Sequence, residues 1–328
     1  MKVLITGITG FAGSHLAEYL LQQGDEVWGM VRRRSPLDHI YGILDRIHLV
    51  EGDLTDVRSL QYALSESQPG EVYHLAAQSY VPTSWRAPAE TLYTNVLGEV
   101  NLLESIRQCC PSASVLIAGS SEEYGLVYPE ELPIKETQPL RPLSPYGVSK
   151  VAQDLLGWQY AQSFGMRIVR TRAFNHTGPR RGKMFASSNF AFQLCRIKFG
   201  LQEPRVEVGN LDTIRDFSDV RDVVAGYVAV LRKGKTGEVY NICSGRGYRI
   251  GEVLQMLVER AGIKVEIVQK AERMRPSDVP VLIGDNTKIR SEIGWERKIS
   301  FEQTLTDLLA YWETELQKGM GKSSKSVI

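Results

Sequence analysis

Residues 2–13 read KVLITGITGFAG, a short apolar run that stops at a turn containing three glycines. Apolar residues at helical spacing follow this turn, so the local order is strand, tight turn, helix. The glycines at Gly7, Gly10 and Gly13 permit a tight turn and a close approach of the backbone to a pyrophosphate. The first N–H groups of the following helix then point toward that anion. Because this is the first strand–turn–helix unit of the chain, it predicts dinucleotide binding rather than an ordinary glycine-rich turn.

The alternation of short apolar runs with helix-length segments continues along the chain. It predicts further strands at residues 26–31, 47–51, 71–75, 114–118, 167–171 and 238–242. Strands that alternate with helices form a parallel sheet with helices on both faces, joined by right-handed connections. The predicted fold class is therefore α/β, a doubly wound parallel sheet of the Rossmann type, with a smaller and partly discontinuous α+β substrate domain.

The expected domain boundaries follow from changes in this alternation of strands and helices. A loop signal, GPRRG at residues 178–182, precedes apolar residues at helical spacing up to residue 200. We expect a dinucleotide-binding domain over residues 1–172 and about 208–243. The substrate domain is expected over about 173–207 and 244–318. The last residues, 319–328, are rich in Gly, Ser and Lys and are expected to form a flexible tail.

Composition excludes several classes of protein. The 328 residues contain 39 Lys and Arg against 38 Asp and Glu, for a net charge of +1. Such a balance argues against a nucleic-acid or membrane partner. The longest apolar runs fall short of a membrane span. The four cysteines lack C-x-x-C spacing, so we expect reduced thiols, no metal site and a cytoplasmic location.

Three consecutive arginines, Arg32, Arg33 and Arg34, end the second predicted strand. A site specific for NAD places Asp or Glu there, to accept hydrogen bonds from the ribose 2′-hydroxyl. A guanidinium instead pairs bidentately with phosphate, so NADP(H) is the predicted cofactor and NAD(H) the alternative. A solvated run of charges is the competing interpretation. Asp53 and Leu54, after the third strand, are expected to meet the adenine.

A candidate catalytic group lies in the middle of the chain. Tyr146 and Lys150 are four residues apart after Pro145, so they share one face at the start of a helix. We expect a nearby ammonium and a nicotinamide charge to lower the pKa of the phenol. Ser120 and Glu122 follow the predicted strand at 114–118, at the sheet edge where ligands bind. A turn hydroxyl and a solvent-exposed carboxylate are the simpler interpretations of these two residues.

Together these motifs resemble the extended short-chain dehydrogenases/reductases that act on nucleotide sugars. Further matching segments are LAAQ at 75–78, FNHTGP at 174–179, VGNLD at 208–212 and YNICSG at 240–245, which resemble the branch that acts on GDP-mannose. The resemblance covers nearly the whole chain. It implies an NADP-binding Rossmann domain joined to a nucleotide-sugar-binding domain.

For activity, the resemblance implies NADP(H)-dependent 4-reduction of GDP-4-dehydro-6-deoxy-D-mannose, in the synthesis of rhamnose-type GDP-deoxyhexoses. Ser120 would hydrogen-bond the C4 oxygen, Tyr146 would deliver the proton, and Lys150 would bind the nicotinamide ribose. The alternative is a GDP-mannose 4,6-dehydratase, in which Glu122 is the base at C5. A further alternative, a non-catalytic NADP-binding scaffold or sensor, is disfavoured by the intact catalytic residues.

The resemblance also implies the remaining site residues and the assembly. The expected cofactor-binding residues, besides those at the second and third strands, are Gly7, Thr9, Gly10, Phe11, Ala12, Gly13, Leu75, Ala76, Ala77, Asn95, Tyr146 and Lys150. The expected substrate-binding residues, besides Ser120, are Asn175, Arg180, Asn189, Lys198, Arg215 and Arg275. Helical stretches at residues 91–106 and 152–163 are expected to pair in a homodimer or homotetramer.

Overall fold

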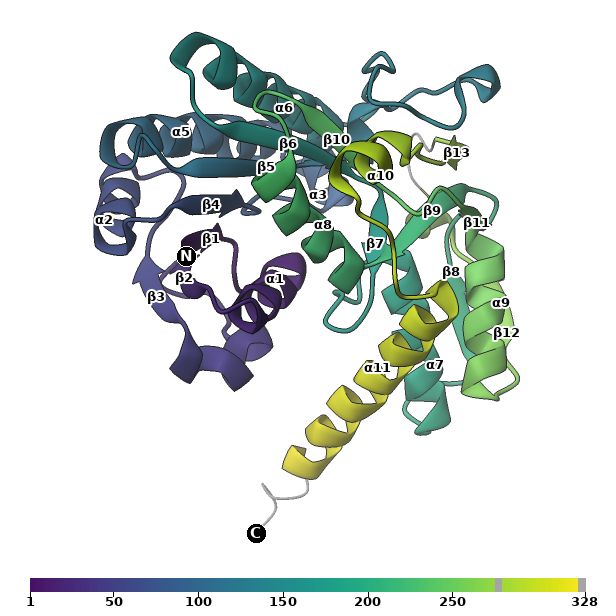
Figure 1. Ribbon diagram of the computed structural model, residues 1–328. Coiled ribbons are helices and arrows are strands. Elements are labelled where there is room, and N and C mark those ends of the chain that lie inside the picture. The colour runs from purple at the N-terminus through teal and green to yellow at the C-terminus, as the bar shows by residue number, and fades with distance from the viewer. Residues whose placement is uncertain (275–278, 324–328) are drawn as a thin grey trace.

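The large sheet has seven parallel strands in the order β10-β6-β5-β4-β1-β2-β3 (Figure 1). The computed structural model describes residues 1–274 and 279–323. The strands are β1 (Lys2–Thr6), β2 (Glu26–Val31), β3 (His48–Glu51), β4 (Glu71–His74), β5 (Ser114–Ser120), β6 (Ile168–Ala173) and β10 (Val239–Ile242). Every one coincides with a predicted strand, and the doubly wound α/β fold is confirmed. The strand order reverses between β1 and β4, and ligands bind at such a switch point.

Helices cover both faces of this sheet. Helices α1 (Phe11–Gln22) and α8 (Val220–Lys233) lie on one face, and α2 (Val57–Ser67), α5 (Gly98–Cys109) and α6 (Pro145–Phe164) lie on the other (Figure 1). Each face therefore buries its own apolar cluster. Burial on both faces explains why the strands read as continuous apolar runs.

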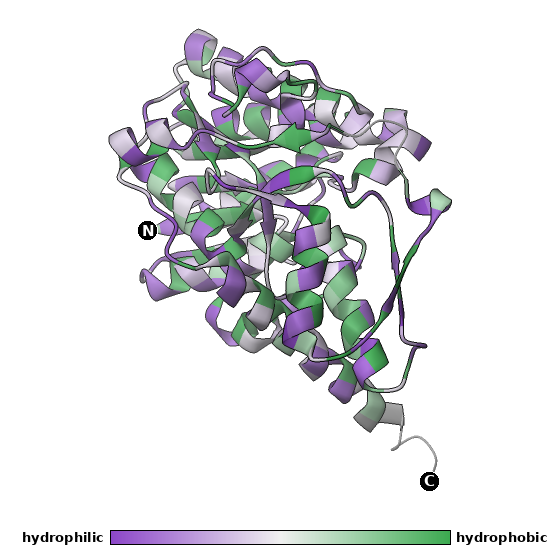
Figure 2. Cartoon of the chain, turned by 90° about the vertical axis from the view of Figure 1, so that its right-hand side faces the viewer, coloured by the Kyte–Doolittle hydropathy of each residue, from purple (hydrophilic) through white to green (hydrophobic). Residues whose placement is uncertain are grey.

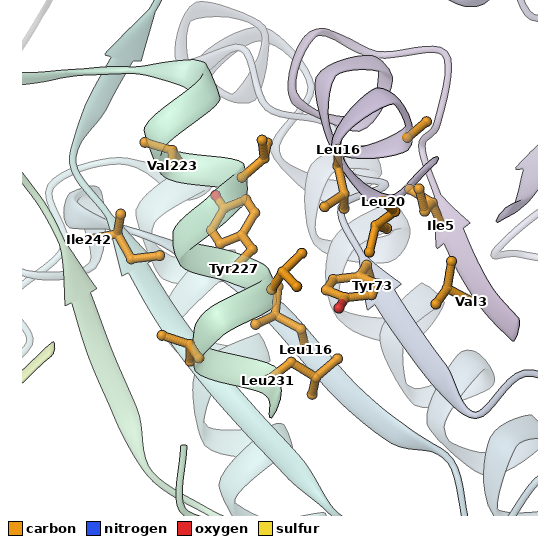
Figure 3. Close-up of a cluster of buried hydrophobic side chains, with 14 of the residues drawn as sticks. Val3, Ile5, Leu16, Leu20, Tyr73, Leu116, Val223, Tyr227, Leu231 and Ile242 are labelled. Atoms are coloured by element: carbon orange, nitrogen blue, oxygen red, sulfur yellow. The ribbon is translucent and has the colours of Figure 1, made fainter. Parts of the chain in front are cut away.

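The core under α1 and α8 is formed by the apolar side chains that recur at helical spacing in the sequence. Leu16 and Leu20 of α1 and Tyr227 of α8 point toward Tyr73 and Leu116 of the sheet (Figure 3). These apolar side chains are buried and lie in one continuous cluster. Figure 2 shows hydrophobic and hydrophilic residues alternating along the helices, as expected for helices with one buried face.

Local signals set the ends of the major helices. The side chain of Asp56 caps the start of α2, Ser144 caps α6 and Asp219 caps α8, each by accepting a backbone N–H. Pro145 occupies the first turn of α6, and Gly165 ends that helix in the left-handed conformation. Helix α6 therefore begins at Pro145, so Tyr146 and Lys150 lie one turn apart on the same helix, as the sequence predicts.

The smaller domain is built from two further sheets and three long helices. Its core lies between α7 (Ala186–Lys198), α9 (Ile250–Ala261) and α11 (Phe301–Ser323). One sheet joins β7 (Asn175–Thr177), β9 (Ile214–Asp219), β11 (Gly247–Arg249) and β13 (Val281–Leu282), and the other pairs β8 (Arg205–Val208) with β12 (Glu266–Gln269).

Two segments, β9 and residues 287–295, show how the chain passes between the large sheet and the smaller sheets. The chain returns to the large domain at α8, because β9 pairs with strands of the small domain; the sequence placed this return at about residue 208. The segment 287–295 also packs into the large core through Ile289, Ile293 and Trp295. The chain therefore passes between the large sheet and the smaller sheets more than once.

Shorter elements complete the described chain. The short α-helices are α3 (Val81–Arg86), α4 (Pro88–Leu92) and α10 (Thr287–Ile293). The 3₁₀-helices are η1 (Asp38–Arg46), η3 (Ser121–Glu123), η4 (Pro129–Glu131) and η5 (Ala271–Arg273), and η2 (Tyr93–Leu97) is a π-helical turn. Helix α11 continues to Ser323, past Gly319 where a tail was expected to begin; residues 324–328 lie outside the described chain. In the residues that the structure describes, the helices are too short or too polar to cross a membrane.

The β1–α1 turn supplies a test of the fold. A Cβ on Gly13 would collide with the carbonyl oxygen of Gly7, whereas a Cβ on Gly42 would meet open space. We expect Gly13→Ala to lower the free energy of unfolding by about 1–3 kcal/mol, because the collision forces α1 away from β1. Urea unfolding followed by circular dichroism measures this change. Gly42→Ala is the control, and equal stability of the two variants would contradict the close packing of the turn.

Candidate active site

One cleft of about 1310 Å³ runs along the carboxyl ends of the large sheet, between the two domains. The β1–α1 turn, the ends of β2, β4 and β5, and the start of α6 line its large-domain side. Residues from β7, α7, β8, β9 and the segment 272–274 line the other side. The cleft therefore lies at the switch point of the sheet, where both domains contribute side chains.

The β1–α1 turn forms the floor of the cleft. Gly7 has φ +76°, and a Cβ there would lie 3.0 Å from the Ala76 Cα, so the position requires glycine. The N–H of Gly10 donates to the Gly7 carbonyl at 3.0 Å and closes the turn. In the described chain, α1 starts without a side-chain cap or an acidic first-turn residue. Its first N–H groups are therefore available to an anion. All six predicted residues of the turn line the cleft, namely Gly7, Thr9, Gly10, Phe11, Ala12 and Gly13.

The three arginines after β2 lie in different places, and only one of them lines the cleft. Arg32 lines the cleft, and its backbone N–H donates to Ser35 Oγ at 3.2 Å. Arg33 and Arg34 are exposed and lie outside the cleft lining. Asp53 and Leu54 line the cleft as expected. The structure thus brings one of the three arginines to the predicted adenosine end of the cleft.

Asn95 lies beneath the cleft rather than in it. It is fully buried, and its Oδ1 accepts the Gln78 N–H at 2.8 Å. Its Nδ2 donates to the Gln78 carbonyl at 3.1 Å and to Ser149 Oγ at 2.9 Å. Asn95 therefore fixes the turn after β4 against α6, and that turn brings Leu75, Ala76 and Ala77 to the cleft. A direct cofactor contact by Asn95, as expected from the sequence, does not agree with this geometry.

Three polar side chains converge at the centre of the cleft. Ser120 at the end of β5 lies beside the phenol of Tyr146, which stands in the first turn of α6, closely enough to act on its pKa. One turn later, Lys150 Nζ donates to the Ala118 carbonyl at 2.8 Å. All three residues line the cleft. Strand β5 and helix α6 thus hold a hydroxyl, a phenol and an ammonium together.

The pKa of the Tyr146 phenol differs from the expected direction. Burial raises this pKa above its usual value, while the hydrogen bond from Ser120 and the charge of Arg181 act to lower it. The expectation of a lowered pKa was therefore wrong for the protein alone, because desolvation outweighs the nearby positive charges. At neutral pH the phenol holds its proton, the form required of a general acid.

The two neighbouring glutamates have different surroundings. Glu122 lines the cleft, and its charge acts on the Tyr146 phenol. Glu123 is fully buried, accepts the Ser120 N–H at 2.7 Å and pairs with Arg172 at 3.0 Å. Burial raises the pKa of Glu123 to about 8, and the Arg172 charge opposes this shift. Glu123 therefore positions the backbone of Ser120, while Glu122 is the carboxylate that can meet a ligand.

A buried cluster lies behind Lys150. Thr6 Oγ1 accepts two backbone N–H groups from the turn after β4, so its own proton is left for His74 Nδ1 at 2.9 Å. His74 Nε2 lies 3.8 Å from a Glu99 oxygen and 3.4 Å from the amide nitrogen of Gln153. Burial raises the pKa of Glu99 and lowers that of Lys150, and the attraction between the two groups opposes both shifts.

The expected substrate residues divide into two sets. Asn175, Asn189 and Arg215 line the cleft. Arg180 turns toward α1 and pairs with Glu18, and Lys198 pairs with Glu313 of α11 at 2.7 Å. Neither Arg180 nor Lys198 belongs to the cleft lining, so the structure does not bring them to the site. Arg275 lies outside the described residues.

Further residues line the cleft. Arg181, which the resemblance offers together with Arg180 as a weaker candidate for phosphate or guanine contacts, has its guanidinium carbon 3.4 Å from the centre of the Phe185 ring. The arginine doublet was a visible signal, but sequence cannot tell which of two adjacent side chains enters a cleft. Arg273 is another, and it donates to Asn189 Oδ1 and to Glu207, each at 3.0 Å. Further lining residues that were missed are Met30, Tyr80, Lys183 and Tyr227.

Comparisons with known proteins agree on one family. The model of the family described as GDP-mannose 4,6 dehydratase matches residues 4–308. The GDP-6-deoxy-D-mannose reductase of Pseudomonas aeruginosa is 36% identical over 317 residues, covering 97% of this chain and 99% of that protein. A GDP-mannose 4,6-dehydratase of Vibrio cholerae is 34% identical over 349 residues, covering 94% of this chain and 92% of that protein.

Solved structures extend the similarity to three dimensions. The structure of RMD from Pseudomonas aeruginosa complexed with NADPH has a TM-score of 0.84 at 34% identity, covering 96% of this chain and 100% of that one. A UDP-glucose 4-epimerase from Thermotoga maritima with UDP-glucose has a TM-score of 0.88 at 28% identity, with the same coverage. The fold is thus shared with enzymes whose structures hold a nicotinamide cofactor or a nucleotide sugar.

The contact between His15 of α1 and the loop at Pro179 predicts how stability changes with pH. Its Nε2 contacts the Pro179 carbonyl at 2.9 Å, and burial lowers its pKa to about 4. The folded state therefore binds this proton less readily than the unfolded state, so stability is lost as pH falls from about 6.5 to 4. We expect His15→Gln to reduce that loss by about 3 kcal/mol in urea unfolding at several pH values. His48→Gln, at an exposed position of β3, is the control. Parallel curves for wild type and His15→Gln would contradict the assignment.

Proposed function

The chain belongs to the GDP-mannose 4,6-dehydratase family, and from that premise we propose that it reduces the C4 keto group of GDP-4-dehydro-6-deoxy-D-mannose with NADPH. The observation that carries this proposal is the convergence of Ser120, Tyr146 and Lys150 in the cleft beside the glycine turn. A keto sugar needs two things in such a site: a hydride at C4 and a proton at the C4 oxygen.

The residues of the chain fit NADP(H). A Cβ at Gly7 would crowd the backbone of Ala76, and one at Gly13 would collide with the Gly7 carbonyl, so the glycines let the turn keep the close packing that lines the cleft. The start of α1, free of acidic residues, suits a diphosphate. The end of β2 offers Arg32 for a 2′-phosphate and carries no carboxylate for a free ribose. NADPH supplies the hydride when it is bound.

The chain's own groups would handle the proton. Ser120 would hydrogen-bond the C4 oxygen, because its hydroxyl lies in the cleft beside the Tyr146 phenol. Tyr146, protonated at neutral pH, would give its proton to that oxygen as negative charge develops on it. The Lys150 ammonium, held against Ala118, would stabilise the phenolate that remains and bind the cofactor ribose. Asn175 and Arg215 of the small domain would bind the GDP-sugar, with Arg215 toward its diphosphate.

A second function, dehydration of GDP-mannose, is favoured by one observation. Glu122 lines the cleft and acts on Tyr146 through its charge, as expected of a base that removes the C5 proton. Relatives with each activity have similar identity to this chain. We favour reduction because the reductase relative aligns over 99% of its length at 36% identity.

The choice between the two activities can be tested with two substrates. We expect the enzyme to consume NADPH in proportion to added GDP-4-dehydro-6-deoxy-D-mannose, followed by absorbance at 340 nm and product analysis. Tyr146→Phe should lower kcat by about 10²–10⁴-fold, because it removes the proton donor and keeps the ring. Unchanged kcat in this variant would refute the role of the phenol. Formation of the keto sugar from GDP-mannose, with no net consumption of NADPH and loss on Glu122→Gln, would establish the dehydratase.

We also propose a homodimer formed through α6 and the neighbouring helical stretch. Val148, Leu155 and Trp158 are 45–54% exposed and lie at helical spacing on one face of α6. Tyr93 and Leu97, four residues apart, are 51% and 48% exposed on the adjacent segment. Apolar residues in such a continuous stripe mark an interface.

Light scattering after size exclusion tests this assembly. Wild type should have the mass of two or four chains. Leu155→Glu should give a monomer, because it places a charge in the centre of the apolar stripe. Ile267→Glu makes the same change at an exposed position of β12 and should keep the wild-type mass. A monomeric wild type, or an unchanged Leu155→Glu variant, would refute this interface.

A further inference from the structure

A buried carboxylate, Glu99, lies behind the catalytic group. Glu99 stands in the first turn of α5, and its side chain is 0% exposed. Within residues 1–274 and 279–320, neither of its carboxylate oxygens accepts a hydrogen bond. His74 Nε2 lies 3.8 Å from one of these oxygens. A carboxylate withdrawn from water in this way is costly unless a positive charge faces it or it takes up a proton.

His74 does not supply this positive charge. Burial lowers the pKa of His74 to about 3, so its ring is neutral at neutral pH. The same ring nitrogen that faces Glu99 lies 3.4 Å from the amide nitrogen of Gln153, in the turn of α6 that follows Lys150. His74 therefore contacts both Glu99 and α6, but it does not neutralise the carboxylate.

The other acidic groups that act on Glu99 have cations of their own. They are Glu123, just after β5, and Asp154 of α6. Glu123 pairs with Arg172 at 3.0 Å, and Asp154 pairs with both Arg170 and Arg172 at 2.7 Å. The two arginines of β6 are therefore bound to these two carboxylates, and neither arginine is left for Glu99.

Lys150 is the cation that acts on Glu99. The Lys150 ammonium donates to the Ala118 carbonyl at 2.8 Å, and Ala118 directly follows the residue of β5 that lies opposite His74. The ammonium therefore lies near the ends of β4 and β5, beside the region that Glu99 and His74 occupy. Burial lowers the pKa of Lys150, and the charges of Glu99 and Glu123 oppose this shift. Because Glu123 is already paired with an arginine, Glu99 is the counter-charge that remains for Lys150.

We propose that Glu99 is a positioning residue that keeps the Lys150 ammonium charged beside Tyr146, an inference that rests on the function proposed above. A charged ammonium stabilises the phenolate that remains after Tyr146 has given its proton to the sugar oxygen. Without Glu99, the desolvated amine loses its proton at a lower pH, and Tyr146 becomes a weaker acid above that pH. Glu99 therefore determines the upper pH limit of the reaction, although it lies outside the cleft lining.

The pH profile of kcat tests this role. In Glu99→Gln, the alkaline fall in kcat for NADPH-dependent reduction should lie about 1–3 pH units lower than in wild type, as expected for loss of an opposite charge. Glu99→Asp keeps the carboxylate and should show a smaller shift. The KM for the keto sugar should change by less than about twofold in both variants, because Glu99 acts through Lys150 and does not touch the sugar.

Glu71→Gln is the matched control. Glu71 is also a buried glutamate, but it lies at the other end of β4 from His74 and pairs with Arg232 at 3.0 Å. Loss of this buried pair should make the variant less stable than wild type. Its pH profile should nevertheless match that of wild type, because a structural defect alone does not change the charge of Lys150.

Urea unfolding at neutral pH tests the pairing without the reaction. Glu99→Gln should lower the urea midpoint of the wild-type chain, because it leaves Lys150 without its counter-charge. The same substitution should raise the midpoint of a Lys150→Met chain, where it removes an unpaired buried carboxylate. Failure of Glu99→Gln to fold except in the Lys150→Met chain would be the same result in a stronger form.

Two results would overturn the proposal. An unchanged alkaline fall in kcat in Glu99→Gln would show that Glu99 does not control the charge of Lys150. Equal changes of the urea midpoint in the two chains would show that the two groups do not interact. Failure of the proposed function looks different, since wild type itself would then consume no NADPH with the keto sugar, and the unfolding comparison would still decide the pairing.

Discussion

The contact between the backbone of Gly7 and Gly13 is the constraint on which the cleft depends. With no Cβ between them, α1 packs directly onto the end of β1, and the turn bends back beside Ala76. This packing directs the start of α1 into the switch point between β1 and β4. A side chain at Gly13 would separate the helix from the turn, and one at Gly7 would push that turn away from Ala76, so either would change the floor of the cleft.

Buried ionic contacts around β5, β6 and α6 hold Ser120 and Tyr146 in place. Glu123 accepts the Ser120 N–H and pairs with Arg172 of β6, and Arg172 also pairs with Asp154 of α6 at 2.7 Å. Buried pairs of this kind add little net stability, but breaking one is strongly destabilising. The network therefore restricts how β5 can move relative to α6, and so fixes Ser120 beside Tyr146.

The electrostatics of the cleft suit anionic ligands, although carboxylates such as Glu122 also line it. Arg32 and Arg181 enter the cleft from the adenosine end and the centre, and Arg215 enters from the small domain. Behind them, Glu99 and Lys150 share a desolvated region in which the charge of each depends on the other. The neutral Tyr146 phenol, the arginines that line the cleft and the buried pair of Glu99 and Lys150 together suit the proposed donation of a proton to a sugar oxygen near two diphosphates.

The sequence alone determined the fold of the large domain and the position of the Ser120–Tyr146–Lys150 group. Local signals suffice there: apolar runs bounded by glycine turns set the strands, and Pro145 starts the helix that carries both Tyr146 and Lys150. Only the tertiary structure decided which of two adjacent arginines faces the cleft, that Asn95 supports a turn, and that burial raises the pKa of Tyr146. Each of these depends on groups distant in the chain, such as Glu18, Ser149 and Phe11, and neither residue type nor spacing encodes the distance to them.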